Sequence, residues 1–261
     1  MRTKHEQILL RIEAAEREAA ELMLHARSIL AETKSGRRDV VTEYDRRVQA
    51  LLTERLQAAV PGARFFCEET DERGRLDAPQ LFIIDPIDGT MNFVHGFHHS
   101  CISVAYAERG EVQAAAVYNP YVDELFTAIR GQGACLNGSP IRVAEGGLGE
   151  SVVCYGTSPY DASLADRTFA LARKVYDASL DLRREGSAAL DLCTVAAGRA
   201  GLYFELQTSL WDYAAGALIV REAGGQCCRT DGSPFSADGG KTDIAAGSPA
   251  ALAEFLRLAR D

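Results

Sequence analysis

The sequence has no apolar run that approaches the roughly 20 residues a membrane-crossing helix needs. Its first segment, residues 2–27, mixes Glu, Arg, Lys and His throughout, so we expect no apolar secretory region there. Internal repeats and low-complexity linkers are also lacking, which excludes fibrous and repeat architectures. We therefore expect no membrane partner and, by default, a cytoplasmic location.

Cys-x-x-Cys pairs are absent as well, which removes the usual sequence signature of a zinc or redox site. The seven cysteines are odd in number, are scattered, and mostly stand in apolar segments. We interpret them as small buried hydrophobic side chains. They are Cys67, Cys101, Cys135, Cys154, Cys193, Cys227 and Cys228.

Basic residues are the minority among the charges, with 28 Lys and Arg against 37 Asp and Glu, and the net charge is −9. Such a surface repels phosphate groups unless a local basic patch or a bound metal reverses it, so we expect no direct nucleic-acid partner. Apolar residues are plentiful at 47%, with 25% charged, as in folded soluble proteins. The length of 261 residues allows one large domain or two small ones.

Apolar periodicity predicts a mixture of helices and strands. Spacings of three and four from Ile8 to Ile29 predict one helix over residues 3–34, packed on its own domain rather than in a coiled coil. Further helices are expected at 45–59, 161–178, 188–198, 212–223 and from 248 to about 260. Strands are expected at 64–67, 81–84, 100–107, 112–118, 124–129 and 202–206, with an antiparallel meander among them.

The rhythm of these elements changes near residue 143. Residues 1–142 read as an α+β part that carries the acidic motifs, and residues 143–261 as an α/β part that completes the site. We predict that the two parts form one compact unit.

Four carboxylates stand beside apolar elements, where an uncompensated charge is costly. Glu68 follows a strand, Asp85 ends the most apolar strand, Asp88 lies three residues on, and Asp212 begins a helix. Divalent cations offset such a cluster, and oxygen-only ligands select hard ions such as Mg²⁺. The Asp-Pro-Ile-Asp turn adds the backbone carbonyl of Ile87 as a further oxygen.

The residues that follow Asp88 indicate an anionic ligand. If Gly89 and Thr90 open a helix, free backbone N–H groups face an anion there. Two divalent ions neutralise four carboxylates, and a third leaves a charge that matches a phosphate dianion. The sequence thus predicts a phosphate site built on metals.

Together these motifs closely resemble the inositol monophosphatase family of Mg²⁺-dependent, lithium-sensitive sugar phosphatases. The specific matches are Asp-Pro-Ile-Asp-Gly-Thr-Met-Asn-Phe at 85–93 and Trp-Asp-Tyr-Ala-Ala-Gly at 211–216, with Glu-Glu-Thr at 68–70. Softer matches follow in family order over residues 34–247, nearly the whole chain.

The resemblance implies a layered αβαβα sandwich, of the type shared with fructose-1,6-bisphosphatase, and a homodimer. It implies two or three Mg²⁺ ions per site, with Mn²⁺ also possible. Glu68, Asp85 and the Ile87 carbonyl would hold the first ion, and Asp85, Asp88 and Asp212 the second. Glu68 would reach a third ion through water.

The resemblance also implies catalytic and substrate roles. A metal-activated water near Glu68 and Thr90 would attack, with Asp45 orienting Thr90, while the backbone of Gly89 and Thr90 holds the phosphate. Glu205 would accept hydrogen bonds from polyol hydroxyls, in a pocket shared with Asp88 and Ala188.

Because two anions repel, Glu205 favours a monophosphate over a bisphosphate. We therefore predict a phosphatase for a small polyol phosphate, with myo-inositol monophosphate as the leading substrate.

Several alternatives stay open at this point. Residues 154–161 differ from the common family pattern on the substrate side, so other esters remain candidates. These are fructose 1,6-bisphosphate, 3′-phosphoadenosine 5′-phosphate, histidinol phosphate or a nucleotide. Some bacterial family members also act with RNA polymerase, which makes an added regulatory role an alternative.

Two other groups of residues are interpreted as ordinary surface. His95, His98 and His99 lie close together, but we favour solvated loop side chains over a transition-metal site. Arg183 and Arg184 are interpreted as surface or dimer-interface residues rather than as ligands of a second phosphate.

Overall fold

Helices and strands alternate along the chain, and the computed structural model describes them over residues 2–36, 39–70, 75–236 and 239–260. The helices are α1 (Lys4–Leu24), α2 (Glu43–Ala59), α3 (Thr90–His95), α4 (Ala165–Ala178), α5 (Ala188–Ala196), α6 (Leu210–Glu222) and α7 (Pro249–Leu258). The strands of the first half are β1 (Ala31–Gly36), β2 (Asp39–Thr42), β3 (Arg64–Cys67), β4 (Leu81–Asp88), β5 (Cys101–Glu108), β6 (Glu111–Asn119), β7 (Glu124–Ile129), β8 (Gly133–Leu136) and β9 (Ser139–Pro140). Those of the second half are β10 (Val152–Tyr155), β11 (Asp181–Arg183), β12 (Leu202–Thr208), β13 (Gln226–Cys228) and β14 (Thr242–Gly247).

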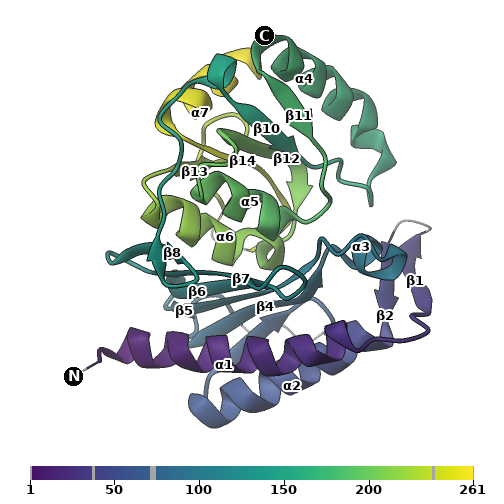
Figure 1. The fold of residues 1–261 in the computed structure, drawn as a ribbon, viewed down its shortest axis with the longest axis vertical. Coiled ribbons are helices and arrows are strands. Elements are labelled where there is room, and N and C mark those ends of the chain that lie inside the picture. The colour runs from purple at the N-terminus through teal and green to yellow at the C-terminus, as the bar shows by residue number, and fades with distance from the viewer. Residues whose placement is uncertain (1, 37–38, 71–74, 237–238, 261) are drawn as a thin grey trace.

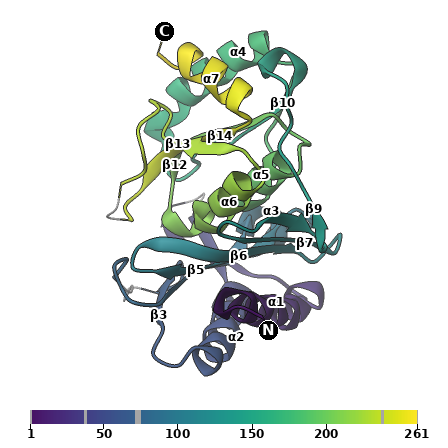
Figure 2. The same ribbon diagram turned by 90° about the vertical axis from the view of Figure 1, so that its left-hand side faces the viewer.

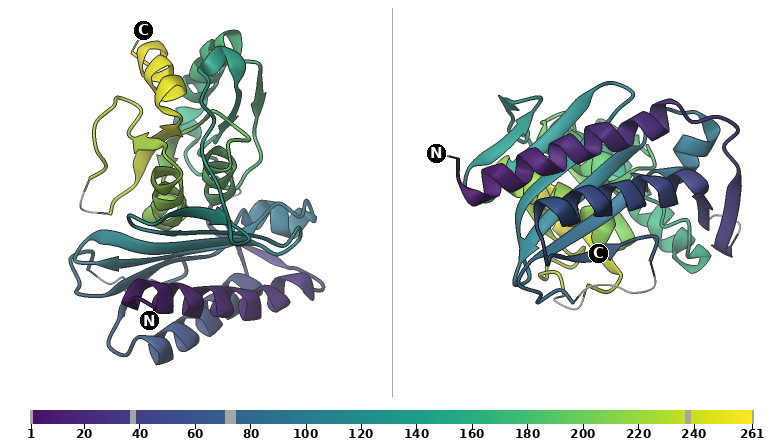
Figure 3. Two further views of the ribbon diagram at one scale, coloured as in Figure 1. Left: turned by 60° about the vertical axis from the view of Figure 1, so that its left-hand side comes forward. Right: turned by 90° about the horizontal axis from the view of Figure 1, so that it is seen from below.

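These elements stack in five layers (Figure 1). Helices α1 and α2 lie side by side beneath the first sheet, as the view from below shows (Figure 3). Helices α5 and α6 lie between the two sheets, and α4 and α7 cover the far side of the second (Figure 2). The predicted αβαβα sandwich is confirmed.

Within the described residues, the first sheet has seven strands in the order β3-β4-β5-β6-β7-β8-β9. Only the β3–β4 pair in it is parallel. The antiparallel meander predicted from residue 100 onward is therefore confirmed. The second sheet, in the order β11-β10-β12-β14-β13, is mixed.

Three apolar clusters fill the spaces between the layers. One joins α1 and α2 to the lower face of the first sheet, and a second joins its upper face to α5 and α6. The third lies between the second sheet and the pair α4 and α7. Because α6 is apolar nearly all round, its residues 213–220 are buried between the two sheets, and its partly buried first turn begins at the cleft.

The single helix predicted over residues 3–34 is wrong at its C-terminal end. Helix α1 stops at Leu24, and the chain then forms β1, which pairs antiparallel with β2. Ser28 has a positive φ of 52°, which no α-helix accommodates. The Tyr44 hydroxyl bonds both the N–H and the carbonyl of Arg27 and so fixes this non-helical backbone.

Strand β4 also runs further than predicted. Its pairing with β5 continues through Asp85↔Ser103 to Asp88↔Cys101, with a register shift between the two pairs. The predicted turn at Pro86 and Ile87 is thus an irregular, bulge-like strand end. Among the residues described, no helix is long and apolar enough to cross a membrane.

Candidate active site

The irregular end of β4 presents two carboxylates that both reach one cleft. Asp85 is buried, and its Oδ1 accepts a hydrogen bond from the N–H of Ile87 at 3.0 Å. Asp88 is also buried, and its Oδ2 accepts bonds from Ser187 Oγ at 2.6 Å and from the Ala189 N–H at 2.7 Å. Two segments that are far apart in the sequence therefore hold this pair of side chains in place.

Asp212 joins the pair from the first turn of α6. Its Oδ2 accepts a hydrogen bond from the N–H of Ser209 at 2.6 Å, and the two residues form a reciprocal capping box. Oxygens of Asp85, Asp88 and Asp212 all lie within 4.8 Å of one another. The structure thus brings together three of the four predicted acidic ligands.

Burial and mutual repulsion govern the charges of this carboxylate cluster. Desolvation and the neighbouring Glu68 and Asp88 raise the pKa of Asp85 well above its ordinary value. Desolvation and Asp88 do the same to the pKa of Asp212. Burial also raises the pKa of Asp88, against the opposing hydrogen bonds from Ser187 and Ala189. A cluster of this kind has a strong electrostatic preference for a cation.

The fourth acid, Glu68, follows β3 and is partly buried. Its backbone N–H bonds the carbonyl of Ile84, which places it beside the end of β4. It lines one cavity of about 280 Å³ together with Asp85, the Ile87 backbone and Asp212. Glu68 is therefore a neighbour of the carboxylate cluster rather than a member of its tightest group.

Thr90 begins α3, directly after the cluster. Its hydroxyl lies 3.3 Å from Asp45 Oδ1 and 3.1 Å from the carbonyl oxygen of Ile87. Asp45 is fully buried, and its other oxygen accepts bonds from the N–H and the hydroxyl of Thr42 at 2.8 and 2.6 Å. Asp45 is therefore the third helical residue in the capping box of α2, whose N-cap is Thr42, and it also offers an acceptor to the Thr90 hydroxyl.

Gly89 allows close approach of backbone segments at this point. Its φ is +87°, and a Cβ there would lie 3.0 Å from the carbonyl oxygen of His99. The helix expected after it is confirmed as α3, with Gly89 as its N-cap residue.

A second cavity, of about 270 Å³, extends the site toward α5 and β12. It contains Gly89, Thr90, Ala188 and Glu205, which places every predicted substrate residue in one continuous cleft with the carboxylate cluster. Glu205 is buried and accepts hydrogen bonds from the Tyr203 hydroxyl at 2.6 Å and from the Ser158 N–H at 2.7 Å. Burial raises the pKa of Glu205 in spite of these bonds.

Sequence reasoning missed several residues of this cleft. Ser187 and the Ala189 N–H fix Asp88, while Tyr160 and Lys241 line both cavities. Arg184, which we expected at the surface or at a dimer interface, lines the cavity that also contains Glu205. The Gly-Ser dipeptide before a helix was a usable signal for Ser187 as an N-cap residue, whereas Lys241 carried no local signal.

A five-layer sandwich (Figure 1) with a carboxylate cluster in a polar cleft is the arrangement of a metal-dependent phosphatase. The sequence model of the inositol monophosphatase family matches residues 4–261. The chain belongs to the inositol monophosphatase family, whose activity is phosphoric monoester hydrolysis.

Named relatives agree with this placement. The inositol-1-monophosphatase of Rhizobium meliloti is 41% identical over 214 residues, 82% of this chain and 78% of that protein. Nus factor SuhB of Escherichia coli is 36% identical over 231 residues, 88% of this chain and 85% of that protein.

Solved structures agree as well. The crystal structure of the extragenic suppressor protein SuhB from Bartonella henselae is similar with a TM-score of 0.89 and 32% identity, covering 98% of both chains. An IMPase/NADP phosphatase complexed with Mg²⁺ and phosphate is similar with a TM-score of 0.83 and 25% identity, over 97% of this chain and 93% of that one.

Proposed function

We propose that this protein is a Mg²⁺-dependent phosphatase that hydrolyses a phosphate monoester of a small polyol, with myo-inositol monophosphate as the leading substrate. The observation that carries the proposal is the cluster of Asp85, Asp88 and Asp212, whose oxygens lie within 4.8 Å of one another in the cleft that also contains Thr90.

The donor set fits Mg²⁺. Three buried or partly buried carboxylates with raised pKa values repel one another until a cation neutralises them. Every donor is oxygen, which suits a hard ion; Mn²⁺ is the alternative. Glu68, Asp85 and the Ile87 carbonyl would hold one ion, and Asp85, Asp88 and Asp212 a second, with Glu68 near a third. The relative that was solved with Mg²⁺ and phosphate supports this choice.

When bound, Mg²⁺ lowers the pKa of water and neutralises charge that develops on the phosphoryl group. Thr90 then orients the attacking water. Its hydroxyl hydrogen is directed to Asp45 Oδ1 or to the Ile87 carbonyl, so a lone pair of its oxygen is free to accept the proton of the water. When the Thr90 hydroxyl donates to Asp45 Oδ1, Asp45, which is fixed by Thr42, accepts the proton that Thr90 passes on. The water oxygen then bonds phosphorus as the ester P–O bond breaks, and the leaving alkoxide takes a proton from solvent water.

Glu205 determines the class of alcohol that leaves. Its Oε1 accepts the Ser158 N–H, its Oε2 accepts the Tyr203 hydroxyl, and the carboxylate keeps further lone pairs for hydroxyl groups of a polyol. A second phosphate directly beside this carboxylate would be repelled, which favours a monophosphate, although Arg184 and Lys241 in the same cavity would attract a phosphate placed near them. Asp88, Gly89 and Ala188 complete the walls of the same cleft.

Phosphate release from a panel of small esters, with and without Mg²⁺, tests the proposal. Release from inositol monophosphate in the presence of Mg²⁺ alone supports it. Release from a bisphosphate, histidinol phosphate or a nucleotide instead would keep the metal chemistry and replace the substrate. No release from any ester at millimolar Mg²⁺ would overturn the enzymatic proposal.

A second candidate function is suggested by the relatives named Nus factor SuhB, one of which shares 36% identity with this chain. We propose this regulatory role, through contact with RNA polymerase, as an addition to hydrolysis. Affinity capture with the tagged protein tests it, with RNA polymerase subunits as the expected catch. Their absence, alongside intact phosphatase activity, would remove the regulatory role alone.

We also propose that the parts 1–142 and 143–261 form one compact unit, that two copies form a homodimer, and that the protein works in the cytoplasm. The apolar clusters that span the layers support the single unit. One cooperative unfolding transition is the expected result for it, and a dimer mass in light scattering is expected for the assembly. Two separated transitions, or a monomer mass, would contradict these proposals.

A further inference from the structure

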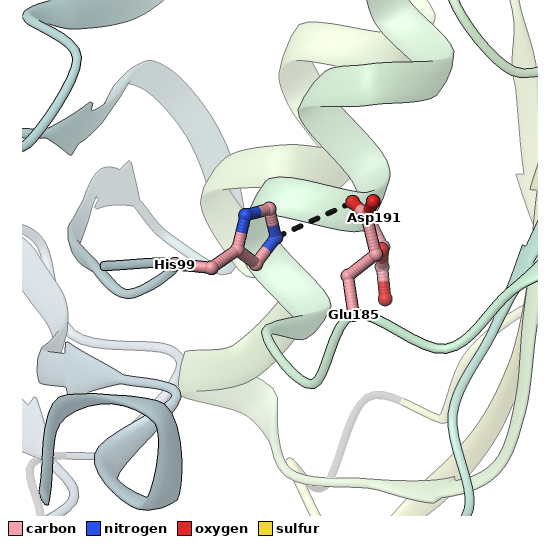
Figure 4. A group of neighbouring side chains, drawn as sticks. All are labelled: His99, Glu185 and Asp191. Atoms are coloured by element: carbon pink, nitrogen blue, oxygen red, sulfur yellow. Dashed lines mark ion pairs between the residues drawn. The ribbon is translucent and has the colours of Figure 1, made fainter. Parts of the chain in front are cut away.

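A second group of titratable side chains lies outside the carboxylate cluster, and one of its members, Asp191, also lines the cavity that contains Glu205. His99 precedes β5, Glu185 lies between β11 and α5, and Asp191 stands in the first turn of α5. One donor atom from each of the three lies within 4.8 Å of the others. Figure 4 shows the three side chains beside the start of α5, with a dashed line for the ion pair between His99 and Glu185.

Asp191 is the unusual member of this triad. Its side chain is 99% buried, with 1% exposed, and its Oδ1 has no hydrogen-bond partner among the described residues. A buried carboxylate oxygen without a partner is costly, and Asp191, whose only side-chain hydrogen bond among the described residues is with Cys154, contributes one carboxylate oxygen to the group containing His99. This unpartnered oxygen is an independent indication of a bound cation.

Two of the basic residues near the triad, Arg183 and Arg199, are engaged with other acids, and Arg184 donates a hydrogen bond to the Thr157 hydroxyl at 3.2 Å. Arg183 Nη1 lies 2.5 Å from Asp181 Oδ2, and Arg199 pairs with Glu124 through both terminal nitrogens, at 2.9 and 2.6 Å. Burial, Glu185, Glu205 and Asp88 together raise the pKa of Asp191 well above its ordinary value. The local field around the triad is therefore negative.

We propose that His99, Glu185 and Asp191 form a second metal site that binds a divalent transition-metal ion such as Zn²⁺. Imidazole nitrogen combined with carboxylate oxygen suits Zn²⁺, whereas Mg²⁺ prefers oxygen throughout. The distance from His99 Nε2 to Glu185 Oε2 is 3.4 Å. Two ligands about 2.1 Å from a tetrahedral Zn²⁺ are separated by about 3.4 Å.

Access from solvent is open, because the side chains of His99 and Glu185 are 30% and 35% exposed. We expected ordinary solvated histidines, and the structure differs from that expectation at His99. His98 is exposed and stacks on Tyr121 at 4.7 Å, whereas His99 is partly buried and turned toward the two acids.

The metal would link the segment before β5, which carries His99, to the segment before α5, which carries Glu185, and both segments border the catalytic cleft. Asn92 Nδ2 already bridges the carbonyls of His99 and Glu185, at 2.7 Å to each. Ser187, which lies two residues after Glu185, donates a hydrogen bond to Asp88. A cation held by the triad would tie the same two segments through side chains, so its role is structural.

Zn²⁺ titration by calorimetry, with millimolar Mg²⁺ present to occupy the oxygen-rich cluster, tests the proposal. Wild type is compared with Glu185→Gln and His99→Gln, and with His98→Gln as the matched control. We expect wild type and His98→Gln to bind one more equivalent of Zn²⁺ than the other two variants. Added Zn²⁺ should also raise the unfolding temperature of the first pair alone.

Equal Zn²⁺ stoichiometry and equal thermal shifts in all four proteins would overturn the proposal and leave His99 and Glu185 as a simple ion pair. Glu185→Gln conserves size at a partly exposed position, so it decides the question even if His99→Gln folds poorly. The readouts are independent of ester hydrolysis. A failed phosphatase assay would therefore leave this test intact.

Discussion

Replacing Asp85 by Asn should stabilise the metal-free protein while abolishing hydrolysis. Asp85 is 2% exposed, and repulsion from Glu68, Asp88 and Asp212 adds to its desolvation. At an effective dielectric constant of about 20, two unit charges about 5 Å apart repel by about 3 kcal/mol. The amide removes one charge and still accepts the N–H of Ile87.

Proton uptake by the cluster already lowers this repulsion in the wild type. The substitution therefore stabilises the protein by less than the full Coulomb energy. We expect Asp85→Asn to raise the free energy of unfolding by about 1–3 kcal/mol near pH 8 in the presence of a chelator. Urea denaturation followed by circular dichroism measures this change. Added Mg²⁺ should stabilise wild type, by about 2.7 kcal/mol at one hundred times its Kd, and should leave the variant nearly unchanged.

The stability of the metal-free wild-type protein should depend on pH with a definite sign. The pKa values of Asp85 and Asp212 are raised in the folded state, so the folded protein binds more protons than the unfolded chain above the ordinary carboxyl pKa of about 4. Stability of the metal-free wild type should therefore fall as pH rises through the raised values. Asp85→Asn should flatten this slope.

Asp243→Asn is the matched control with the opposite sign. Burial alone would raise the pKa of Asp243, but hydrogen bonds from Thr230 and Arg229 outweigh it and hold the pKa below its ordinary value. The same chemical change should therefore destabilise the protein at this position. If Asp85→Asn lowers the free energy of unfolding as Asp243→Asn does, the argument from repulsion is refuted.

Three further variants probe the cleft. Glu205→Gln should raise KM for a polyol monophosphate by about 10–100-fold with a smaller change in kcat, because hydrogen bonds to a charged acceptor weaken; steady-state kinetics checks this, and an unchanged KM would count against the polyol role. Thr90→Val should lower kcat by about 100-fold while Thr90→Ser keeps most of it, and equal activities would exclude the proton relay to Asp45. Ser187→Ala should lower the free energy of unfolding by about 1–2 kcal/mol in urea denaturation, since it loses both the α5 cap and a donor to Asp88; Ser187→Thr is the control that retains the hydroxyl.

Local sequence was sufficient to find the parts of the site that are contiguous in the chain. Asp85, Asp88 and Thr90 lie within six residues, and their spacing together with Gly89 limits the backbone to a few conformations. Asp212 was recognisable from the family motif Trp-Asp-Tyr-Ala-Ala-Gly at 211–216, because an acid in the first turn of a helix is by itself more often a simple cap. These residues carry their own structural signals.

The remaining residues depend on pairing between distant segments, which periodicity does not record. Ser187 meets Asp88 across 99 positions of sequence, and Asp191 meets His99 because α5 packs above the first sheet. The helix predicted to reach residue 34 failed for the same reason. The apolar spacing continues through Ile29, but pairing of β1 with β2 and the contact of Tyr44 with Arg27 override it.

The register shift at the end of β4 limits how the carboxylate cluster can be copied into another protein scaffold. In a regular strand, residues three apart point to opposite faces, so Asp85 and Asp88 would be separated by the thickness of the sheet. The irregular backbone between their pairings with Ser103 and Cys101 lets both reach one cleft. A designer who copied the side chains onto an ideal strand would obtain no cluster. The portable unit is the bent strand together with its antiparallel partner β5.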